Sequence, residues 1–224
     1  MIEKYLKKKI ERYDIISFDI FDTLIERDVR VPTDIFKRIA ESCFNTENER
    51  NAFWKNRVWA EQEARKNRTD GEVTLDEIYT KLLDKYDDSI TEKLMQSEIR
   101  EEIKACRPKN KLISVYKHAM LRGKKVYFIS DMYLPKEVIS ELLSKCSVYE
   151  YEKLYVSNAY RANKVSGELF QIVCTENQLK KEDWLHIGDS FKADFKGARK
   201  SGISSILLYR KGLIKNRLCK FFKG

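Results

Sequence analysis

Two rhythms of apolar and polar positions follow one another along the chain, and they change near Pro32 and again near Pro108. The run Ile15-Ile-Ser-Phe-Asp-Ile-Phe21 is short, apolar and flanked by charged residues, which is typical of a buried strand. Residues 2–12 before it predict a short helix. The first part of the chain therefore begins as helix and then strand.

Residues 33–105 have helical periodicity almost throughout. Thr74 and Glu77 form a capping-box pattern, and Gly71 marks a turn before it. The pattern predicts helices over residues 33–43, 48–67, 75–86 and 91–105. We therefore expect residues 33–106 to form a small helical domain.

After Pro108, strand patterns and helix patterns alternate, which indicates a parallel sheet with right-handed crossovers. Residues 14–24 supply a further strand of the same sheet. The predicted strands are 125–129, 154–156, 184–187 and 204–208, and the predicted helices are 111–122, 135–145, 167–176 and 193–200. The predicted fold is α/β: a doubly wound, Rossmann-like core (1–32 and 107–208), an inserted α-helical cap (33–106) and a basic tail (209–224).

Composition excludes several classes of protein. With 224 residues, of which 42% are hydrophobic, the chain can bury a core, so wholesale disorder is excluded. Its 5 cysteines are scattered without a CxxC pair, which favours neither a zinc site nor a disulfide framework. No apolar run is long enough to span a bilayer, and the N-terminus lacks the apolar segment of a signal peptide. We expect a cytoplasmic protein.

The formal net charge of +9 comes from the two ends, residues 1–12 and 209–224. A basic stripe on the folded body is missing, so we expect no nucleic-acid partner. In the tail, Ile214, Leu218 and Phe222 recur every four residues between Lys and Arg, which predicts a short basic amphipathic helix. Such a helix suits peripheral contact with the inner face of the membrane or with a partner groove. Packing on the chain's own core is the alternative.

Polar residues follow the predicted strands, where open α/β sheets bind their ligands. Asp19 ends the first strand, and Ser130-Asp131 end the second. Asn163-Lys164 precede the helix after the third, and Gly188-Asp189-Ser190 end the fourth, with Asp194 five residues after Asp189. Carboxylates suit Mg²⁺, and a lysine and a hydroxyl suit the oxygens of a phosphate ester. Asp19 can then attack phosphorus and form an aspartyl-phosphate.

This set resembles the four ordered motifs of the haloacid dehalogenase-like (HAD) superfamily. The residues that carry the resemblance are Phe18-Asp-Ile-Phe-Asp-Thr-Leu24, Ser130-Asp131, Lys164 and Gly188-Asp-Ser190 with Asp194. The helical insertion resembles that superfamily's cap, so the resemblance covers residues 13–208. The finer sequence is similar to a bacterial subgroup of hydrolases associated with surface-polysaccharide biosynthesis and sometimes joined to glycosyltransferases.

The resemblance implies a Mg²⁺-dependent phosphohydrolase acting on a small phosphorylated metabolite, such as a sugar phosphate. Asp19 is then the nucleophile and a metal ligand, with Asp189, Asp194 and the backbone carbonyl of Phe21 as further ligands. We expect the phosphate to be bound by Thr23, Ser130, Asp131 and Lys164.

The chain departs from the family pattern at Phe21, where typical phosphatases carry the Asp that protonates the leaving oxygen. Such acid catalysis contributes about 10²–10⁴-fold in rate. Asp22 follows one residue later, and one step along a strand moves a side chain to the opposite face. Asp22 is therefore either a substitute acid or a turn former.

Two residues are candidates for contacts with the rest of the substrate. Arg27 either reaches a substrate anion or is a solvated loop arginine. Glu63 shares a face of a cap helix with Trp59, four residues before it.

Two other functions stay open because of Phe21. The first is a weakly catalytic or non-catalytic phosphate-binding partner of a glycosyltransferase in surface-polysaccharide synthesis. The second is a metal-free haloacid dehalogenase, a class with an aromatic residue at this position. Against the second, Asp189 and Asp194 suit a cation, which dehalogenation does not use.

Overall fold

A five-stranded parallel sheet in the order β5-β4-β1-β6-β7 forms the centre of the protein. The structure is a computed structural model, and it describes residues 2–66, 68 and 71–208. The strands are β1 (Ile15–Phe18), β4 (Lys125–Ser130), β5 (Lys153–Val156), β6 (Trp184–Gly188) and β7 (Ser204–Leu207). From β1 the chain adds β4 and β5 on one side and β6 and β7 on the other, so the strand order reverses at β1. This confirms the predicted doubly wound fold.

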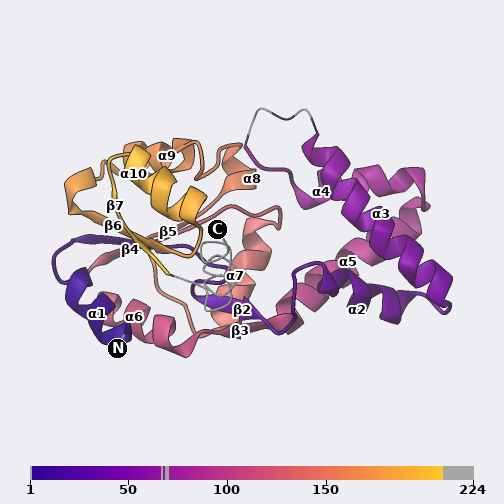
Figure 1. Cartoon of the computed structure of the whole chain (residues 1–224), viewed down its shortest axis with the longest axis horizontal. Helices are drawn as coiled ribbons and strands as arrows, with labels where there is room; N and C mark the ends of the chain where they lie inside the picture. Colours follow the sequence, from indigo (N-terminus) through magenta and orange to yellow (C-terminus); the bar gives the residue numbers. More distant parts are fainter. Residues whose placement is uncertain (1, 67, 69–70, 209–224) are drawn as a thin grey trace, which may run out of the picture.

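Helices cover both faces of the sheet (Figure 1). The helices of the core are α1 (Ile2–Ile10), α6 (Asn110–Leu121), α7 (Lys136–Lys145), α8 (Ser157–Tyr160), α9 (Glu168–Asn177) and α10 (Ala198–Lys200), with a short 3₁₀ turn, η2 (Lys181–Asp183). On one face, Ile16, Phe18 and Phe128 pack in one apolar cluster with residues of α1, α6 and α7. On the other, Tyr127 and Trp184 pack with residues of α9 and α10. Burial on both faces explains why these strands are almost continuously apolar.

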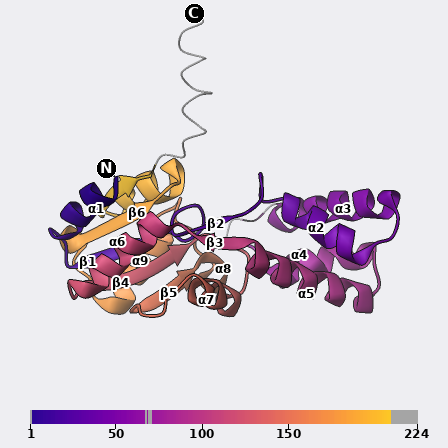
Figure 2. The same cartoon turned by 90° about the horizontal axis from the view of Figure 1, so that it is seen from below.

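The segment between β1 and β4 contains a group of helices that lies to one side of the sheet (Figures 1 and 2). These helices are α2 (Asp34–Cys43), α3 (Glu47–Arg65), α4 (Leu75–Thr80), η1 (Lys81–Asp84) and α5 (Asp88–Ala105). The predicted capping box is present, because Thr74 Oγ1 accepts from the Glu77 N–H at 3.1 Å and Glu77 Oε2 accepts from the Thr74 N–H at 2.8 Å. A buried ion pair joins α3 to α5, with Arg57 Nη2 2.7 Å from Glu98 Oε1.

A small antiparallel ribbon, which the sequence analysis does not predict, carries the chain into and out of these helices. It pairs β2 (Ile25–Arg27) with β3 (Cys106–Pro108). The ribbon is next to the end of β1, so it places Arg27 close to the sheet edge where Asp19 lies.

Three of the predicted elements also differ in length or geometry from their prediction. β1 ends at Phe18 rather than Phe21, because the carbonyl of Ile20 accepts hydrogen bonds from three following N–H groups and Asp22 turns the chain with a positive φ of 59°. The helix expected over 75–86 is an α-helix only as far as Thr80, the end of α4, and the chain continues as the 3₁₀ turn η1. The helix expected over 193–200 begins as a π-helix, η3 (Phe191–Gly197).

The amphipathic helix predicted in the tail, residues 209–224, lies outside the described residues. Across the part of the chain that the structure describes, no helix is both long and apolar enough to cross a membrane.

Candidate active site

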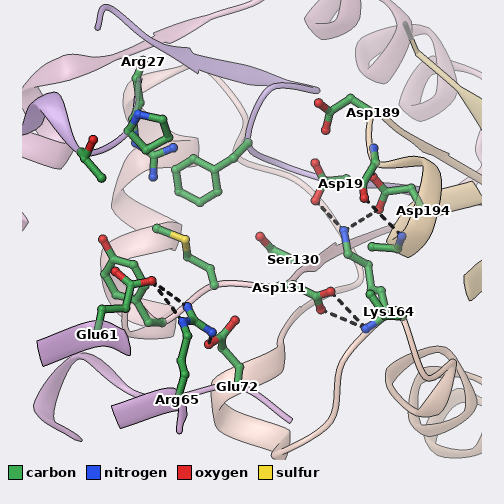
Figure 3. Close-up of a pocket in the computed structure, with 18 of the residues that line it drawn as sticks. Asp19, Arg27, Glu61, Arg65, Glu72, Ser130, Asp131, Lys164, Asp189 and Asp194 are labelled. Carbon is green, nitrogen blue, oxygen red and sulfur yellow. Dashed lines mark hydrogen bonds and ion pairs between the residues drawn. The ribbon is translucent and has the colours of Figure 1, made fainter. Parts of the chain in front are cut away.

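Asp19 lies directly after β1, at the point where the strand order reverses, and its backbone N–H donates to the carbonyl of Ile187 on β6 at 2.9 Å. The Lys164 ammonium lies 2.6 Å from Asp19 Oδ1 and 2.6 Å from Asp194 Oδ1 (Figure 3). All three side chains are buried. Residues 145 positions apart in sequence thus form one cluster at the carboxyl edge of the sheet.

The loop that carries Lys164 is held from two sides. Both oxygens of Asp131, at the end of β4, accept from the backbone N–H of Lys164, at 3.0 and 3.2 Å. On the other side, Gly197 comes so close that a Cβ there would lie 1.9 Å from the Lys164 carbonyl oxygen. Only glycine fits at position 197. Asp131 and Gly197 thus fix the backbone of Lys164, and the two ion pairs fix its ammonium group.

Asp194 is held by η3 and by Gly188. The backbone N–H of Ser190 donates to Asp194 Oδ2 at 2.8 Å, and Ser190 also caps η3 through the N–H of Ala193. A Cβ on Gly188 would lie 2.3 Å from Asp194 Cγ, so glycine is required for the carboxylate to pack against β6. π-Helical turns often occur at functional sites, and here the π-helix brings Asp194 back to Lys164.

A buried hydrogen-bond chain lies behind Asp194. Trp184 Nε1–H donates to Ser17 Oγ at 2.8 Å, Ser17 Oγ lies 2.8 Å from His186 Nδ1, and His186 Nε2 lies 3.1 Å from Asp194 Oδ1. Burial lowers the pKa of His186, which favours the neutral ring. Because the indole only donates, the hydroxyl donates to Nδ1 and Nε2–H donates to the carboxylate. His186 is therefore a buried core histidine that orients Asp194.

The acidic groups at this edge have perturbed pKa values. Burial, with added repulsion from Asp194, outweighs the Lys164 ammonium and raises the pKa of Asp19 to about 7. Partial burial raises the pKa of Asp189 and that of Asp131, each to about 6. Burial also acts on Asp194, but Lys164 and the His186 hydrogen bond outweigh it and lower its pKa.

Three of these carboxylates can share a cation. Asp19, Asp189 and Asp194 each offer one oxygen, and the three oxygens lie within 4.8 Å of one another. Hard carboxylate oxygens are the ligands that Mg²⁺ prefers, and Mg²⁺ commonly takes its remaining ligands from water and substrate phosphate. The donor set therefore fits Mg²⁺.

We predict that the metal-free protein loses stability as the pH rises from about 5 to about 7.5. The ordinary pKa of the carboxyl groups of Asp19, Asp131 and Asp189 is 3.8, and folding raises it. The folded state therefore binds protons more tightly than the unfolded state between about pH 4 and pH 7, and it is destabilised as these protons leave. Asp194, with a lowered pKa, stays ionised across this range and adds no slope. His186 acts in the opposite direction below its ordinary pKa of 6.5, because burial lowers its pKa, but it is one group against three carboxyls.

Calorimetric melting in EDTA at the two pH values measures this effect, with the same scans in excess Mg²⁺ as the control. We expect the metal-free melting temperature to fall by a few degrees, and Mg²⁺ to raise it more at the higher pH. A melting temperature that rises with pH in EDTA would contradict the prediction.

A cavity of about 520 Å³ opens beside the cluster. Of the residues predicted from the sequence, Asp19, Phe21, Arg27, Ser130, Asp131, Lys164, Asp189 and Asp194 line it. Asp22, Thr23 and Glu63 do not belong to its lining. Asp22 lines an adjoining hollow, which shares Arg27 with the cavity. Thr23 is fully buried with an unpartnered hydroxyl, and Glu63 pairs with Lys66 at 3.3 Å.

The cavity also has a second side, the cap side, formed by the helical segment between β1 and β4, where the sequence analysis proposes Glu63 as the substrate contact. Glu61, Arg65 and Glu72 line it there, together with Phe36. Arg27 lines the cavity and is not a solvated loop arginine. Its Nε donates to the buried Glu102 at 2.7 Å, and its guanidinium lies 4.4 Å from the centre of the Phe21 ring.

Comparison with known proteins shows the fold. No protein-family model and no curated protein sequence matches the chain. Among solved structures, it is similar to a HAD hydrolase from Bacillus subtilis, YfnB, bound to magnesium, at a TM-score of 0.58 and 16% identity over 88% of this chain and 89% of that one. A HAD phosphatase from Thermococcus onnurineus gives a TM-score of 0.61 and 14% identity, over 89% and 87% of the two chains.

L-2-haloacid dehalogenase from Xanthobacter autotrophicus is similar as well, with a TM-score of 0.59 and 14% identity over 92% of this chain and 83% of the dehalogenase. The chain therefore has the Rossmann-like α/β fold of HAD hydrolases over most of its length. At these identities the likeness extends to the fold alone, and both phosphatases and dehalogenases are among the structures that share it.

Proposed function

We propose that the protein is a Mg²⁺-dependent phosphohydrolase that works through an aspartyl-phosphate on Asp19. The observation that supports this most directly is the buried cluster in which the Lys164 ammonium lies 2.6 Å from both Asp19 and Asp194, beside Asp189. A carboxylate nucleophile and an anionic phosphate ester repel each other. The ammonium offsets this repulsion, and Mg²⁺ held by Asp19, Asp189 and Asp194 would supply further positive charge to the phosphoryl oxygens.

The reaction has two steps. An oxygen of Asp19 attacks phosphorus, the bond between phosphorus and the ester oxygen breaks, and the leaving alkoxide takes a proton from water. Water then attacks the phosphorus of the aspartyl-phosphate, the bond to Asp19 breaks, and orthophosphate and a proton are released. Lys164 and Ser130, which line the cavity beside Asp19, donate hydrogen bonds to the phosphoryl oxygens.

The aromatic ring of Phe21 affects the first step, because it has no proton to give to the leaving oxygen. Asp22 lines the adjoining hollow and not the cavity that Asp19 lines, so its position does not support it as the substitute acid. We therefore expect alkyl esters to be hydrolysed more slowly than aryl or acyl phosphates, whose leaving groups need no acid.

A panel of phosphate compounds tests the proposed function. We expect p-nitrophenyl phosphate or acetyl phosphate to release orthophosphate in the presence of Mg²⁺, and EDTA to lower the rate by about 10²-fold or more. Excess Mg²⁺ added after EDTA restores the rate and serves as the control. Turnover that persists in EDTA, or no turnover of any compound, would overturn the proposal; the second result would favour the non-catalytic phosphate-binding alternative.

A metal-free haloacid dehalogenase is the second candidate. Phe21 lines the cavity beside Asp19, and a dehalogenase is among the structures with this fold. Asp19 would attack the carbon of a 2-haloacid, halide would leave without a proton, and water would hydrolyse the ester. Halide release that survives EDTA would establish this function in place of the first.

A role in surface-polysaccharide synthesis, at the inner face of the membrane or beside a glycosyltransferase, stays a proposal from the sequence. The segment expected to make these contacts, residues 209–224, lies outside the described residues.

A further inference from the structure

A chain of charged side chains forms the cap side of the cavity. Arg65 lies between two carboxylates: its Nη2 is 3.0 Å from Glu61 Oε1, and its Nη1 pairs with Glu72 Oε1. Figure 3 shows that these three side chains lie at the other end of the cavity from Asp189 and Asp194. A substrate whose phosphate is held near Asp19 would place its leaving group against them.

The charge of this side favours a neutral leaving group. Arg65 is one cation between two carboxylates, so the three side chains carry a net charge of −1 when ionised. Arg27 pairs with Glu102 at 2.7 Å, and Arg57 pairs with Glu98 at 2.7 Å and with Glu61 at 3.2 Å. Counting these two arginines and their two buried glutamates with the three side chains leaves the net charge at −1. Among these described side chains, carboxylates therefore outnumber guanidinium groups by one, so a second anionic group on the substrate would meet a net negative charge at Glu61 and Glu72.

The hydrogen-bonding capacity of this side fits hydroxyl groups. Carboxylate oxygens accept hydrogen bonds and guanidinium N–H groups donate them, whereas a hydroxyl does both. The side chains of Glu61, Arg65 and Glu72 keep 26%, 40% and 12% of their surface exposed, so a ligand can reach them. The apolar side chains of Phe21, Phe36 and Met132 line the same cavity and suit the C–H faces of a polyol or sugar.

The segment that carries Glu72 is fixed to the core. A Cβ on Gly71 would lie 2.2 Å from the backbone of Arg161, so only glycine allows this approach. The backbone N–H of Leu75 donates to the Tyr133 carbonyl at 2.9 Å, and Arg161 Nη2 lies 2.9 Å from Glu77. These contacts with the core hold Glu72 beside Arg65. Glu72 is therefore positioned independently of α3, the helix that carries Glu61 and Arg65.

We propose that Glu61, Arg65 and Glu72 form a specificity site for the leaving group, and that the substrate is the monophosphate of a neutral polyol or sugar rather than a phosphorylated carboxylic acid or a bisphosphate. This inference rests on the proposed function, since it assumes that the phosphate is held by Asp19 and Lys164. It adds the chemical class of the substrate and the side chains that select it.

Substrate binding without turnover tests the inference most directly. In the Asp19→Asn variant with Mg²⁺, calorimetry measures the dissociation constants of glycerol phosphate, glucose 6-phosphate and phosphoglycolate. We expect the two hydroxylated esters to bind at least about tenfold more tightly than phosphoglycolate. Equal binding, or tighter binding of phosphoglycolate, would overturn the inference.

Changing the charge of the site should change this preference. In the double substitution Glu61→Gln and Glu72→Gln, Arg65 loses both carboxylate partners. We expect the ratio of the dissociation constants of phosphoglycolate and glycerol phosphate to fall by about tenfold or more, in favour of phosphoglycolate. Glu63→Gln, on the same helix but outside the cavity lining, is the matched control and should leave the ratio unchanged. A double variant that keeps the ratio, or a control that changes it equally, would contradict the specificity site.

Hydrolysis assays separate this inference from the proposed function. If the unmodified protein hydrolyses no phosphate compound but still binds hydroxylated esters preferentially, the proposed function fails and the specificity site stands. If it hydrolyses phosphoglycolate with a higher kcat/KM than glycerol phosphate, the proposed function stands and the specificity site fails.

Discussion

Replacing Asp19 by asparagine is expected to lower kcat for any phosphate ester by about 10⁴-fold or more, because an amide oxygen is a poor nucleophile toward phosphorus. The fold should survive the change. Asn has the same shape, and burial already raises the pKa of Asp19 to about 7, so the site tolerates an uncharged group there at neutral pH. We expect the free energy of unfolding to change by less than about 2 kcal/mol. Steady-state assays and denaturant unfolding measure the two effects.

Trapping of the phosphoenzyme adds a direct readout of the nucleophile. Acid quenching during turnover should leave phosphate bound to the unmodified protein and none bound to the Asp19→Asn variant. Asp22→Asn is the matched control, since asparagine also adopts the positive φ of 59° found at this position and the carboxyl lines a different hollow. Near-normal activity of Asp19→Asn would remove Asp19 from the mechanism, and a loss of 10²-fold or more in Asp22→Asn would identify Asp22 as the acid after all.

The proximity of the site residues could be predicted from the sequence, because it follows from topology. Parallel strands of one sheet all end at the same edge, so Asp19, Ser130 and Asp189 must lie together once their strands are correctly identified. The strands themselves are identifiable because burial on both faces requires continuous apolar runs such as Ile15–Phe18.

Short and irregular elements could not be predicted in this way. The strands β2 and β3 are each three residues long, and in the sequence the whole helical segment lies between them. No local periodicity therefore indicates that they pair. The break between α4 and η1 coincides with Thr80, whose hydroxyl donates to the Asp76 carbonyl at 2.8 Å. Such hydrogen bonds to the preceding turn tend to bend a helix.

The cap side of the cavity shows the clearest limit of sequence reasoning. Glu63 is a reasonable candidate from its helical spacing with Trp59, but Glu61 faces the cavity instead. Glu61 and Glu63 are two positions apart, so their side chains point about 200° apart around the helix axis. Choosing between them requires knowing how α3 is rotated about its own axis. That rotation is set by burial of Phe53, Arg57 and Ala60 within the group of helices between β1 and β4, and this packing is not visible in a local pattern.

Replacing Lys164 by methionine is expected to reduce both activity and stability. The side chain is 2% exposed, and its ammonium is within 2.6 Å of the carboxylates of Asp19 and Asp194. Methionine fills most of the volume but leaves both carboxylates buried without their cation. Loss of one partner from a buried ion pair commonly costs about 3–5 kcal/mol, which is a large part of the stability of a typical domain.

Mg²⁺ distinguishes an electrostatic cause from a packing defect. If the variant is destabilised because Asp19 and Asp194 repel each other, Mg²⁺ should restore more stability to Lys164→Met than to the unmodified protein, and lowering the pH should do the same by protonating the carboxylates. Urea unfolding with and without Mg²⁺, at about pH 5 and about pH 7.5, measures both effects. A loss of stability that is the same under all conditions would indicate a cavity instead.

Lys124→Met provides the matched control for this change. Lys124 is also largely covered, with 12% of its side chain exposed, but its partner Asp14 lies 3.5 Å away and is 82% exposed. A pair of this kind contributes about 1 kcal/mol or less, because water already screens the carboxylate. We therefore expect Lys124→Met to retain activity and nearly all stability, whereas Lys164→Met loses about 10²-fold or more in kcat because no ammonium then offsets the charge of the phosphate. Similar losses in the two variants would mean that Lys164 supports the fold like any other buried lysine and has no separate part in the site.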